Sequence, residues 1–174
     1  MKKTVCILML VVPMLILAQE SSISITGGYA PNGFGAQASY NYSLSQKAYV
    51  QLAFLYSQSE DKVKDITIPY KNYSANIGYF YNVIQDNSNR FNLAIGGGAV
   101  LGYDDINNNE SILSNGGLID GKNKFVYGGF AGAETYYYLS DTFALLAVFN
   151  GLYHTNSDLG NTTIYGGFGI RITL

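Results

Sequence analysis

Residues 72–83 read NYSANIGYFYNV, and apolar side chains alternate with mostly small or polar ones along the whole stretch. One series is apolar and consists of Tyr73, Ala75, Ile77, Tyr79, Tyr81 and Val83. The other series includes Asn72, Ser74, Asn76, Gly78 and Asn82. Because successive side chains of a β-strand point to opposite faces, the pattern predicts a strand with one apolar face and one small, polar face.

The same alternation recurs along the rest of the chain. We identify eight such segments, at 22–30, 33–43, 47–58, 72–83, 90–103, 124–139, 142–154 and 162–174. In the second to fifth of them no charged residue falls on the apolar face, where Arg or Lys would cost about 2–4 kcal/mol at the middle of a bilayer. The sequence therefore predicts an all-β fold, an eight-stranded antiparallel up-and-down transmembrane β-barrel.

A soluble barrel is the alternative, because its strands alternate as well but turn their large apolar residues inward. In this chain the second face is too small and polar to serve as an apolar core. Charged residues make up 13% of the sequence, against ~25% in soluble domains. Sixteen tyrosines and no tryptophan complete a composition that favours contact with outer-membrane lipid.

The lengths of the connections predict an orientation. Those at 43–46, 84–89 and 140–141 are short, those at 59–71 and 104–123 are long, 155–161 is intermediate and 31–32 is a tight corner. Short and long connections alternate, as periplasmic turns and extracellular loops do in bacterial barrels. We therefore expect both termini to lie in the periplasm.

Aromatic residues on the apolar faces test this assignment, because they should gather at the two headgroup levels. At the outer strand ends lie Tyr29, Phe34, Tyr56, Tyr73, Tyr103, Phe125, Tyr127 and Tyr153. At the inner strand ends lie Tyr40, Tyr42, Tyr79, Tyr81, Phe91, Tyr137 and Phe143. The sequence thus predicts two aromatic girdles.

The first 18 residues have the pattern of a secretory signal peptide. Lys2 and Lys3 precede an apolar run from Val5 to Leu17, and Ala18 is a small residue at the expected cleavage point. A retained anchor is the alternative, but the run is shorter than the ~20 residues that a spanning helix needs. We expect a signal peptide at 1–18 and an outer-membrane barrel domain at 19–174.

Cysteine content and charge limit the function of the mature chain. Cys6 lies within the signal peptide and no cysteine follows it, so disulfide and thiol chemistry are not expected. Without Lys2 and Lys3, 8 Lys and Arg face 12 Asp and Glu, a net charge of −4. This balance argues against direct nucleic-acid binding.

Glu134 and Arg171 both fall on lumen-facing positions near the inner ends of their strands. We expect them to form a structural ion pair inside the barrel, because an unpaired buried charge costs several kcal/mol. Glu134 as a catalytic acid is the alternative, but no nucleophile or second carboxylate shares its position. The sequence predicts no catalytic residue, metal site or cofactor, and therefore no enzyme.

The remaining polar candidates carry weaker signals. His154 is the single histidine and is expected to be a solvated rim residue, with a barrel enzyme using His154 and Asp158 as the alternative. An acidic loop cluster lacks EF-hand spacing, so a solvated loop is preferred to a Ca²⁺ site. The cluster consists of Asp104, Asp105, Asn107, Asn109 and Glu110.

Several short motifs occur in a fixed order in the second half of the chain. They are Ile66-Thr67-Ile68-Pro69, Gly102-Tyr103-Asp104-Asp105-Ile106-Asn107, Leu118-Ile119-Asp120-Gly121, Phe125-Val126-Tyr127-Gly128-Gly129, Glu134-Thr135-Tyr136, Leu139-Ser140-Asp141 and Gly167-Phe168-Gly169-Ile170-Arg171. Over residues 64–174 the chain resembles the TraO family of conjugative-transposon transfer proteins. Tyr137-Tyr138 departs from the family pattern as an insertion, and Leu174 stands where an aromatic residue is expected. The final strand also resembles the signal that the barrel assembly machinery reads during insertion.

The resemblance implies a role in a conjugative DNA-transfer apparatus, with other proteins of that apparatus as partners. An eight-stranded barrel is just filled by its own side chains. Bulky residues expected in this lumen are Tyr49, Leu55, Phe80, Phe130, Tyr136 and Tyr165. We therefore expect an accessory component that is no DNA conduit, and the alternative is a general outer-membrane barrel for envelope integrity or surface adhesion.

Overall fold

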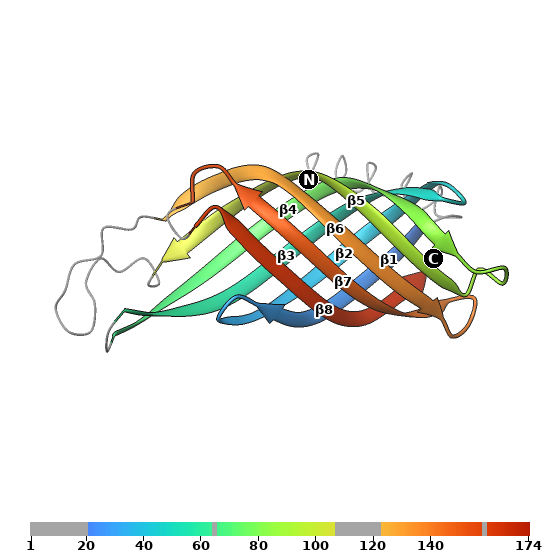
Figure 1. The fold of residues 1–174 in the computed structure, drawn as a ribbon, viewed down its shortest axis with the longest axis horizontal. Helices are drawn as coiled ribbons and strands as arrows, with labels where there is room; N and C mark the ends of the chain where they lie inside the picture. The colour runs from blue at the N-terminus through green and yellow to red at the C-terminus, as the bar shows by residue number, and fades with distance from the viewer. Residues whose placement is uncertain (1–20, 64–65, 107–122, 158–159) are drawn as a thin grey trace, which may run out of the picture.

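The computed structural model describes residues 21–63, 66–106, 123–157 and 160–174. Eight strands form it: β1 (Ser21–Ala30), β2 (Gly33–Ser45), β3 (Ala48–Val63), β4 (Ile66–Gln85), β5 (Phe91–Ile106), β6 (Lys124–Tyr138), β7 (Phe143–His154) and β8 (Thr162–Thr173). Each strand pairs with its neighbours in chain order, and β1 pairs with β8 to close one antiparallel barrel (Figure 1). The predicted fold class is confirmed.

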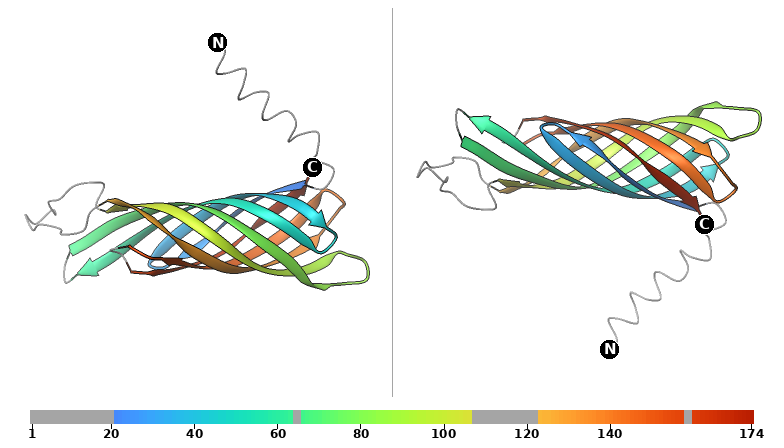
Figure 2. Two further views of the ribbon diagram at one scale, coloured as in Figure 1. Left: turned by 90° about the horizontal axis from the view of Figure 1, so that it is seen from above. Right: turned by 90° about the horizontal axis from the view of Figure 1, so that it is seen from below.

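The two ends of the barrel differ in their connections. β1 begins and β8 ends at the same end, together with the short turns at 46–47, 86–90 and 139–142 (Figure 2). We call this the inner end and the opposite one the outer end. The strands are steeply tilted against the barrel axis (Figure 1), so residues of the same level lie at very different places along their strands.

The stretch at 59–71 contains the end of β3 and the beginning of β4, so the prediction of a long loop there is wrong. β3 continues to Val63 and β4 begins at Ile66, with unbroken pairing between them from Gln58 and Lys71 to Val63 and Ile66. The stretch carries several charges and a proline, and it lies outside the segments of apolar alternation. Outside a bilayer, however, a strand needs no apolar face, so polarity does not end it.

Pro69 is tolerated in β4 because of the side to which its nitrogen points. Its pairing partner Glu60 donates its backbone N–H to the Asn32 carbonyl on the β2 side, at 3.1 Å. Glu60 and Pro69 therefore form a non-hydrogen-bonded pair, in which the backbone nitrogens of both residues point away from the partner strand. The Pro69 nitrogen accordingly points toward β5. The last residue of β5, Ile106, pairs with Tyr70, so the β5 ladder ends before Pro69 and loses no bond.

Alternation holds along the strands wherever side chains are described, and two bulges interrupt the described pairing. The ladder shifts between Ser43 and Ser45 in β2 and between Asn82 and Ile84 in β4. At the second bulge, Val83 and Ile84 are both exposed, at 45% and 51%, although they are consecutive. A bulge inserts one extra residue into a strand and re-aims those after it, which period-2 reasoning alone does not anticipate.

The turn after β4 is closed by the Asp86 side chain. Its carboxylate accepts from the Ser88 hydroxyl at 2.6 Å and from the Phe91 backbone N–H at 3.1 Å. The Ser88 hydrogen bond is the main cause that holds the pKa of Asp86 below its usual range, with the Phe91 bond adding to it.

We expect this turn to lose support in acid. A lowered folded pKa means that the stabilisation is present above the unfolded pKa and is lost as pH falls through the folded value. An NMR titration of the Asp86 carboxyl should show the lowered pKa, and Ser88→Ala should move it back toward the ordinary range. An unchanged pKa in Ser88→Ala would contradict the assigned cause.

Candidate functional site: a filled lumen inside an apolar wall

The structure brings Glu134 of β6 and Arg171 of β8 together in the lumen. Arg171 Nη2 donates to Glu134 Oε2 at 2.5 Å. The Arg171 side chain is 3% exposed and the Glu134 side chain 0%. Alternation turns both residues inward, and pairing of the strands in chain order places β6 and β8 on either side of β7. The charges are therefore paired within a desolvated site.

Residues far away in the sequence complete the hydrogen bonding of this pair. Tyr49 donates its hydroxyl to Glu134 Oε2 and Gln51 donates its Nε2 to Oε1, both at 2.7 Å. Arg171 Nε donates to the Ser24 hydroxyl at 3.1 Å, and its guanidinium lies 4.3 Å from the centre of the Tyr136 ring. Hydrogen bonds of this kind are what allow a buried ion pair to offset its desolvation cost.

Large side chains fill the lumen beyond the pair. The Tyr49 and Phe80 rings stack with 5.3 Å between centroids, and Phe80 in turn contacts Phe130 at 6.2 Å. The six bulky residues expected in the lumen are all buried: Tyr49, Leu55, Phe80, Phe130, Tyr136 and Tyr165. Two cavities remain, one of about 180 Å³ at the outer end and one of about 290 Å³ at the inner end. In the described part of the chain, no residue lines both of them.

Glycines make room for these rings at the lumen wall. A Cβ added at Gly78 would lie 2.6 Å from Cζ of Phe130, closer than side-chain contacts allow. The aromatic filling and the glycines opposite it are therefore one packing arrangement.

We expect Gly78→Ala to destabilise the barrel by about 1–3 kcal/mol, because the Phe130 ring must move in a filled lumen. Urea titration of the barrel in lipid vesicles measures the loss. Gly27→Ala is the matched control, since its nearest neighbour would be 3.9 Å away and its stability should be unchanged. Equal stability of the two variants would show that the lumen is less tightly packed than described.

His154 is buried, and the prediction of a solvated rim residue is wrong. Its side chain is 1% exposed and faces the lumen at the end of β7, in register with Gly128 of β6. Its Nε2 has no hydrogen-bond partner among the described residues. The wall reaches further outward than the apolar pattern suggested, so the last lumen position of β7 remains enclosed.

The acidic loop cluster is likewise divided by the structure. Asp104 belongs to β5, is 2% exposed and accepts from Asn72 at 2.6 Å and from Ser157 at 2.7 Å. Asp105 accepts from Asn123 Nδ2 at 3.1 Å. The remaining residues of this cluster and of the rival enzyme pair lie outside the described residues: Asn107, Asn109, Glu110 and Asp158. Within the described ranges no three His, Cys, Asp or Glu side chains stand close enough to hold a metal ion.

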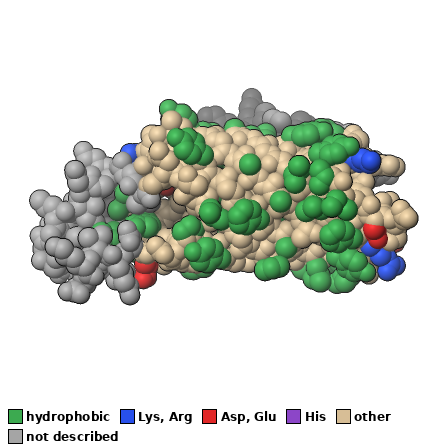
Figure 3. Space-filling model, viewed as in Figure 1, with side chains coloured by type: hydrophobic (Ala, Val, Ile, Leu, Met, Phe, Trp, Pro, Cys, Tyr) green, Lys and Arg blue, Asp and Glu red, His purple; other side chains and the backbone are tan. Residues whose placement is uncertain are grey.

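The aromatic residues assigned to the girdles lie on the outer wall. Most are well exposed, from 38% for Tyr42 to 78% for Phe125, while Tyr40, Tyr56 and Tyr103 are half-buried. At the outer end Tyr56, Tyr73, Tyr103 and Phe125 pair directly across β3 to β6, with ring centroids 5.2 Å apart for Tyr56 and Tyr73. Figure 3 shows hydrophobic side chains spread over the wall, and the charged side chains visible in that view at its two ends.

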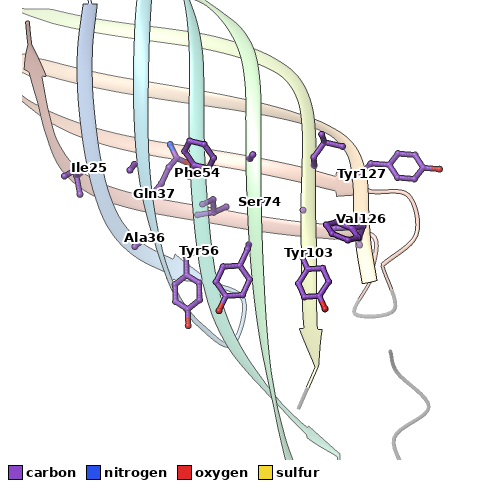
Figure 4. A pocket seen from close by; sticks show the side chains of 16 residues that line it. Ile25, Ala36, Gln37, Phe54, Tyr56, Ser74, Tyr103, Val126 and Tyr127 are labelled. Carbon is purple, nitrogen blue, oxygen red and sulfur yellow. The ribbon is translucent and has the colours of Figure 1, made fainter. Parts of the chain in front are cut away.

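A shallow apolar groove of about 680 Å³ lies beside this aromatic row (Figure 4). Its lining includes the small residues Ala36, Ala38 and Ala75 and the larger residues Phe54, Tyr56 and Tyr127. An apolar groove on a wall of this composition suits contact with lipid chains.

Among the residues that the structure describes, no helix is long and apolar enough to cross a membrane.

Solved structures share the fold at low sequence identity. Neisserial surface protein A aligns with a TM-score of 0.60 and 14% identity over 88% of this chain and 95% of its own. The attachment invasion locus protein Ail of Yersinia pestis gives 0.54 and 19% over 88% and 99%. The N-terminal barrel domain of Pseudomonas aeruginosa OprF gives 0.51 and 14% over 88% and 96%. These likenesses concern the barrel fold alone.

No curated protein matches the chain. A family model described as "Conjugative transposon protein TraO", in contrast, matches residues 16–174. The resemblance read from motifs began at residue 64 and was therefore too short, because the first three strands match the family as well. The chain belongs to the TraO family of conjugative transposon proteins.

Proposed function

We propose that this protein is a non-enzymatic accessory component of a conjugative DNA-transfer apparatus in the outer membrane, with both termini in the periplasm. Family membership supports the link to conjugation. The apolar wall, with its aromatic residues toward both ends, supports placement in lipid. The partners are outer-membrane lipid and other proteins of the apparatus.

The filled lumen is the observation that carries the accessory role. Glu134 and Arg171 are paired at 2.5 Å within a shell that also holds Tyr49 and Gln51. Next to them the stacked Tyr49 and Phe80 rings occupy the cross-section. A barrel that its own side chains fill cannot pass a DNA strand, so its outer wall and its two ends are the surfaces left for other components.

Single-channel recording in planar bilayers tests the closed lumen. The purified protein should give no steady large conductance, because the ion pair and the aromatic rings close the passage. As a positive control, the same bilayers should show the conductance of a known porin. A steady large conductance from the pure protein would overturn the accessory role.

Deletion of the gene tests the link to transfer. Transconjugant counts should fall in the deletion strain and recover when the gene is restored on a plasmid. The competing function, a general barrel for envelope integrity or adhesion, predicts unchanged transfer together with increased sensitivity to detergent or reduced surface attachment. The two outcomes separate the candidates without any assumption about the partner.

A further inference from the structure

The cavity at the inner end of the lumen is lined almost wholly by uncharged polar side chains. It holds about 290 Å³ and opens between the turns at 46–47 and 86–90. Six carboxamides line it: Asn41, Gln46, Asn82, Gln85, Asn89 and Asn92. Serines, tyrosines and Arg171 make up the rest of its lining. This space has room for at least about ten water molecules, or for one pyranose ring with its substituents.

The cavity is electrically neutral although it contains an arginine. The charge of Arg171 is matched by Glu134 at 2.5 Å. Both Glu134 oxygens are engaged, one of them by Gln51 and the other by Tyr49 and Arg171. Arg171 is the charged residue of the lining, and its guanidinium is already bonded to Glu134 and Ser24. Because this charge is compensated within the protein, the site favours an uncharged polar molecule.

Three of the carboxamides, those of Asn82, Gln85 and Asn92, are already held in place by hydrogen bonds within the protein. Gln85 Nε2 donates to Asn92 Oδ1 at 3.0 Å, and Asn92 Nδ2 donates to the backbone carbonyl of Asn89 at 3.0 Å. Tyr136 donates its hydroxyl to Asn82 Oδ1 at 2.9 Å, which orients the amide of Asn82 in the cavity wall. Each amide offers both a donor and an acceptor, and a preformed array of them matches the hydroxyls and acetamido group of a sugar.

An aromatic ring stands at the same cavity. Tyr138 is half-buried in its lining and packs edge-to-face on Tyr136, with 5.7 Å between centroids and planes at 89°. A half-buried tyrosine gives a sugar ring an apolar surface for its C–H face beside a polar hydroxyl. Amides and a tyrosine ring together are the chemistry that recognises carbohydrate.

We propose that the inner cavity binds a neutral N-acetylated sugar unit of a periplasmic glycan, an inference that rests on the proposed function only for the orientation of the barrel. Binding at this end tethers the accessory barrel to the cell-wall polymer while leaving its wall and outer end free. The lining residues with the largest roles are Tyr138 as the stacking surface and Asn82, Gln85 and Asn92 as hydrogen-bonding groups.

The test uses the mature chain, ¹⁵N-labelled and refolded in lipid nanodiscs, with the trisaccharide of N-acetylglucosamine as the probe. Side-chain amide signals of Asn82, Gln85 and Asn92 should shift saturably, with a Kd on the order of 1 mM. A neutral Gly-Ser peptide at the same concentrations should leave these signals in place. Absence of a saturable shift with the sugar, or a larger response to the peptide, overturns the proposal.

Two variants of neighbouring tyrosines supply the matched control. Tyr138→Ala removes the ring in the cavity and should weaken binding about tenfold, whereas Tyr137→Ala removes a ring from the outer wall of the same strand, where it is 44% exposed, and should leave Kd unchanged. Heat-modifiable gel mobility shows whether each variant is a folded barrel. If Tyr138→Ala does not fold, Asn82→Asp serves as the second cavity variant. Equal affinities of the cavity and wall variants contradict the site.

Failure of this inference is distinguishable from failure of the proposed function. Sugar binding is measured on the purified protein and is independent of transfer. A protein that binds no sugar but is needed for transconjugants refutes the cavity site alone. A protein that binds sugar through Tyr138 but is dispensable for transfer refutes the conjugative role alone.

Discussion

Arg171→Leu is expected to destabilise the folded barrel by about 3–5 kcal/mol, because it leaves the Glu134 carboxylate buried without its counter-charge. Glu134 is 0% exposed, and the bonds from Tyr49 and Gln51 supply no full positive charge. Urea unfolding in phospholipid vesicles, followed by far-UV circular dichroism, measures the shift of the midpoint at unchanged slope.

The matched control for this variant removes both charges. The double variant Glu134→Gln with Arg171→Leu should recover most of the lost stability, since neither charge then remains uncompensated. Glu134→Gln alone leaves Arg171 unpaired and should cost a similar amount to Arg171→Leu. A loss under about 1 kcal/mol for both single variants would mean that water reaches the pair and that the lumen is not filled.

Ile77→Arg should destabilise the barrel by about 2–4 kcal/mol in a lipid bilayer, because it places a charge on the wall far from both headgroup levels. Ile77 is 57% exposed on β4 and pairs with Leu52 and Ala99, which are themselves apolar and outward-facing. The side chain has no lumen contacts to lose, so the cost measures the surroundings of the wall. The same urea titration in vesicles reports it.

Phe125→Arg provides the depth control. Phe125 is 78% exposed in the outer aromatic row, where the cost of a charge falls to about 0–1 kcal/mol. A difference between the two positions therefore indicates a bilayer around the middle of the wall. Equal, small losses at Ile77 and Phe125 would be the behaviour of a wall in water and would refute the outer-membrane placement.

The alternation of residues was enough to predict which face of each strand points outward. Tyr73, Ile77 and Tyr81 are exposed as expected, and Ser74 and Asn76 are buried. This succeeds because side-chain direction in a strand is a local property with period 2. Val83 is exposed as expected too, but Ile84, which the pattern assigned to the turn at 84–89, belongs to β4 and is exposed beside it, because a bulge adds a residue that the pattern does not mark.

Strand ends could be predicted only where the bilayer imposes polarity on them. β3 and β4 continue through residues 59–63 and 66–71, which carry charges and a proline. Backbone pairing, not side-chain polarity, sustains them there. The burial of His154 has the same cause, because the wall that encloses it extends beyond the apolar segments.

The sequence by itself determined the filled lumen in outline: an inward-facing Glu134 and Arg171, bulky Phe80 and Tyr165, and an apolar wall with aromatic ends. Tertiary structure alone decided that Tyr49 and Gln51 of β3 reach across to Glu134, and that six amides meet at one inner cavity. Alternation sets the face of a residue from its neighbours in the chain. Which inward residues meet depends on strand tilt and register, and these are settled only when the first and last strands pair and the barrel closes.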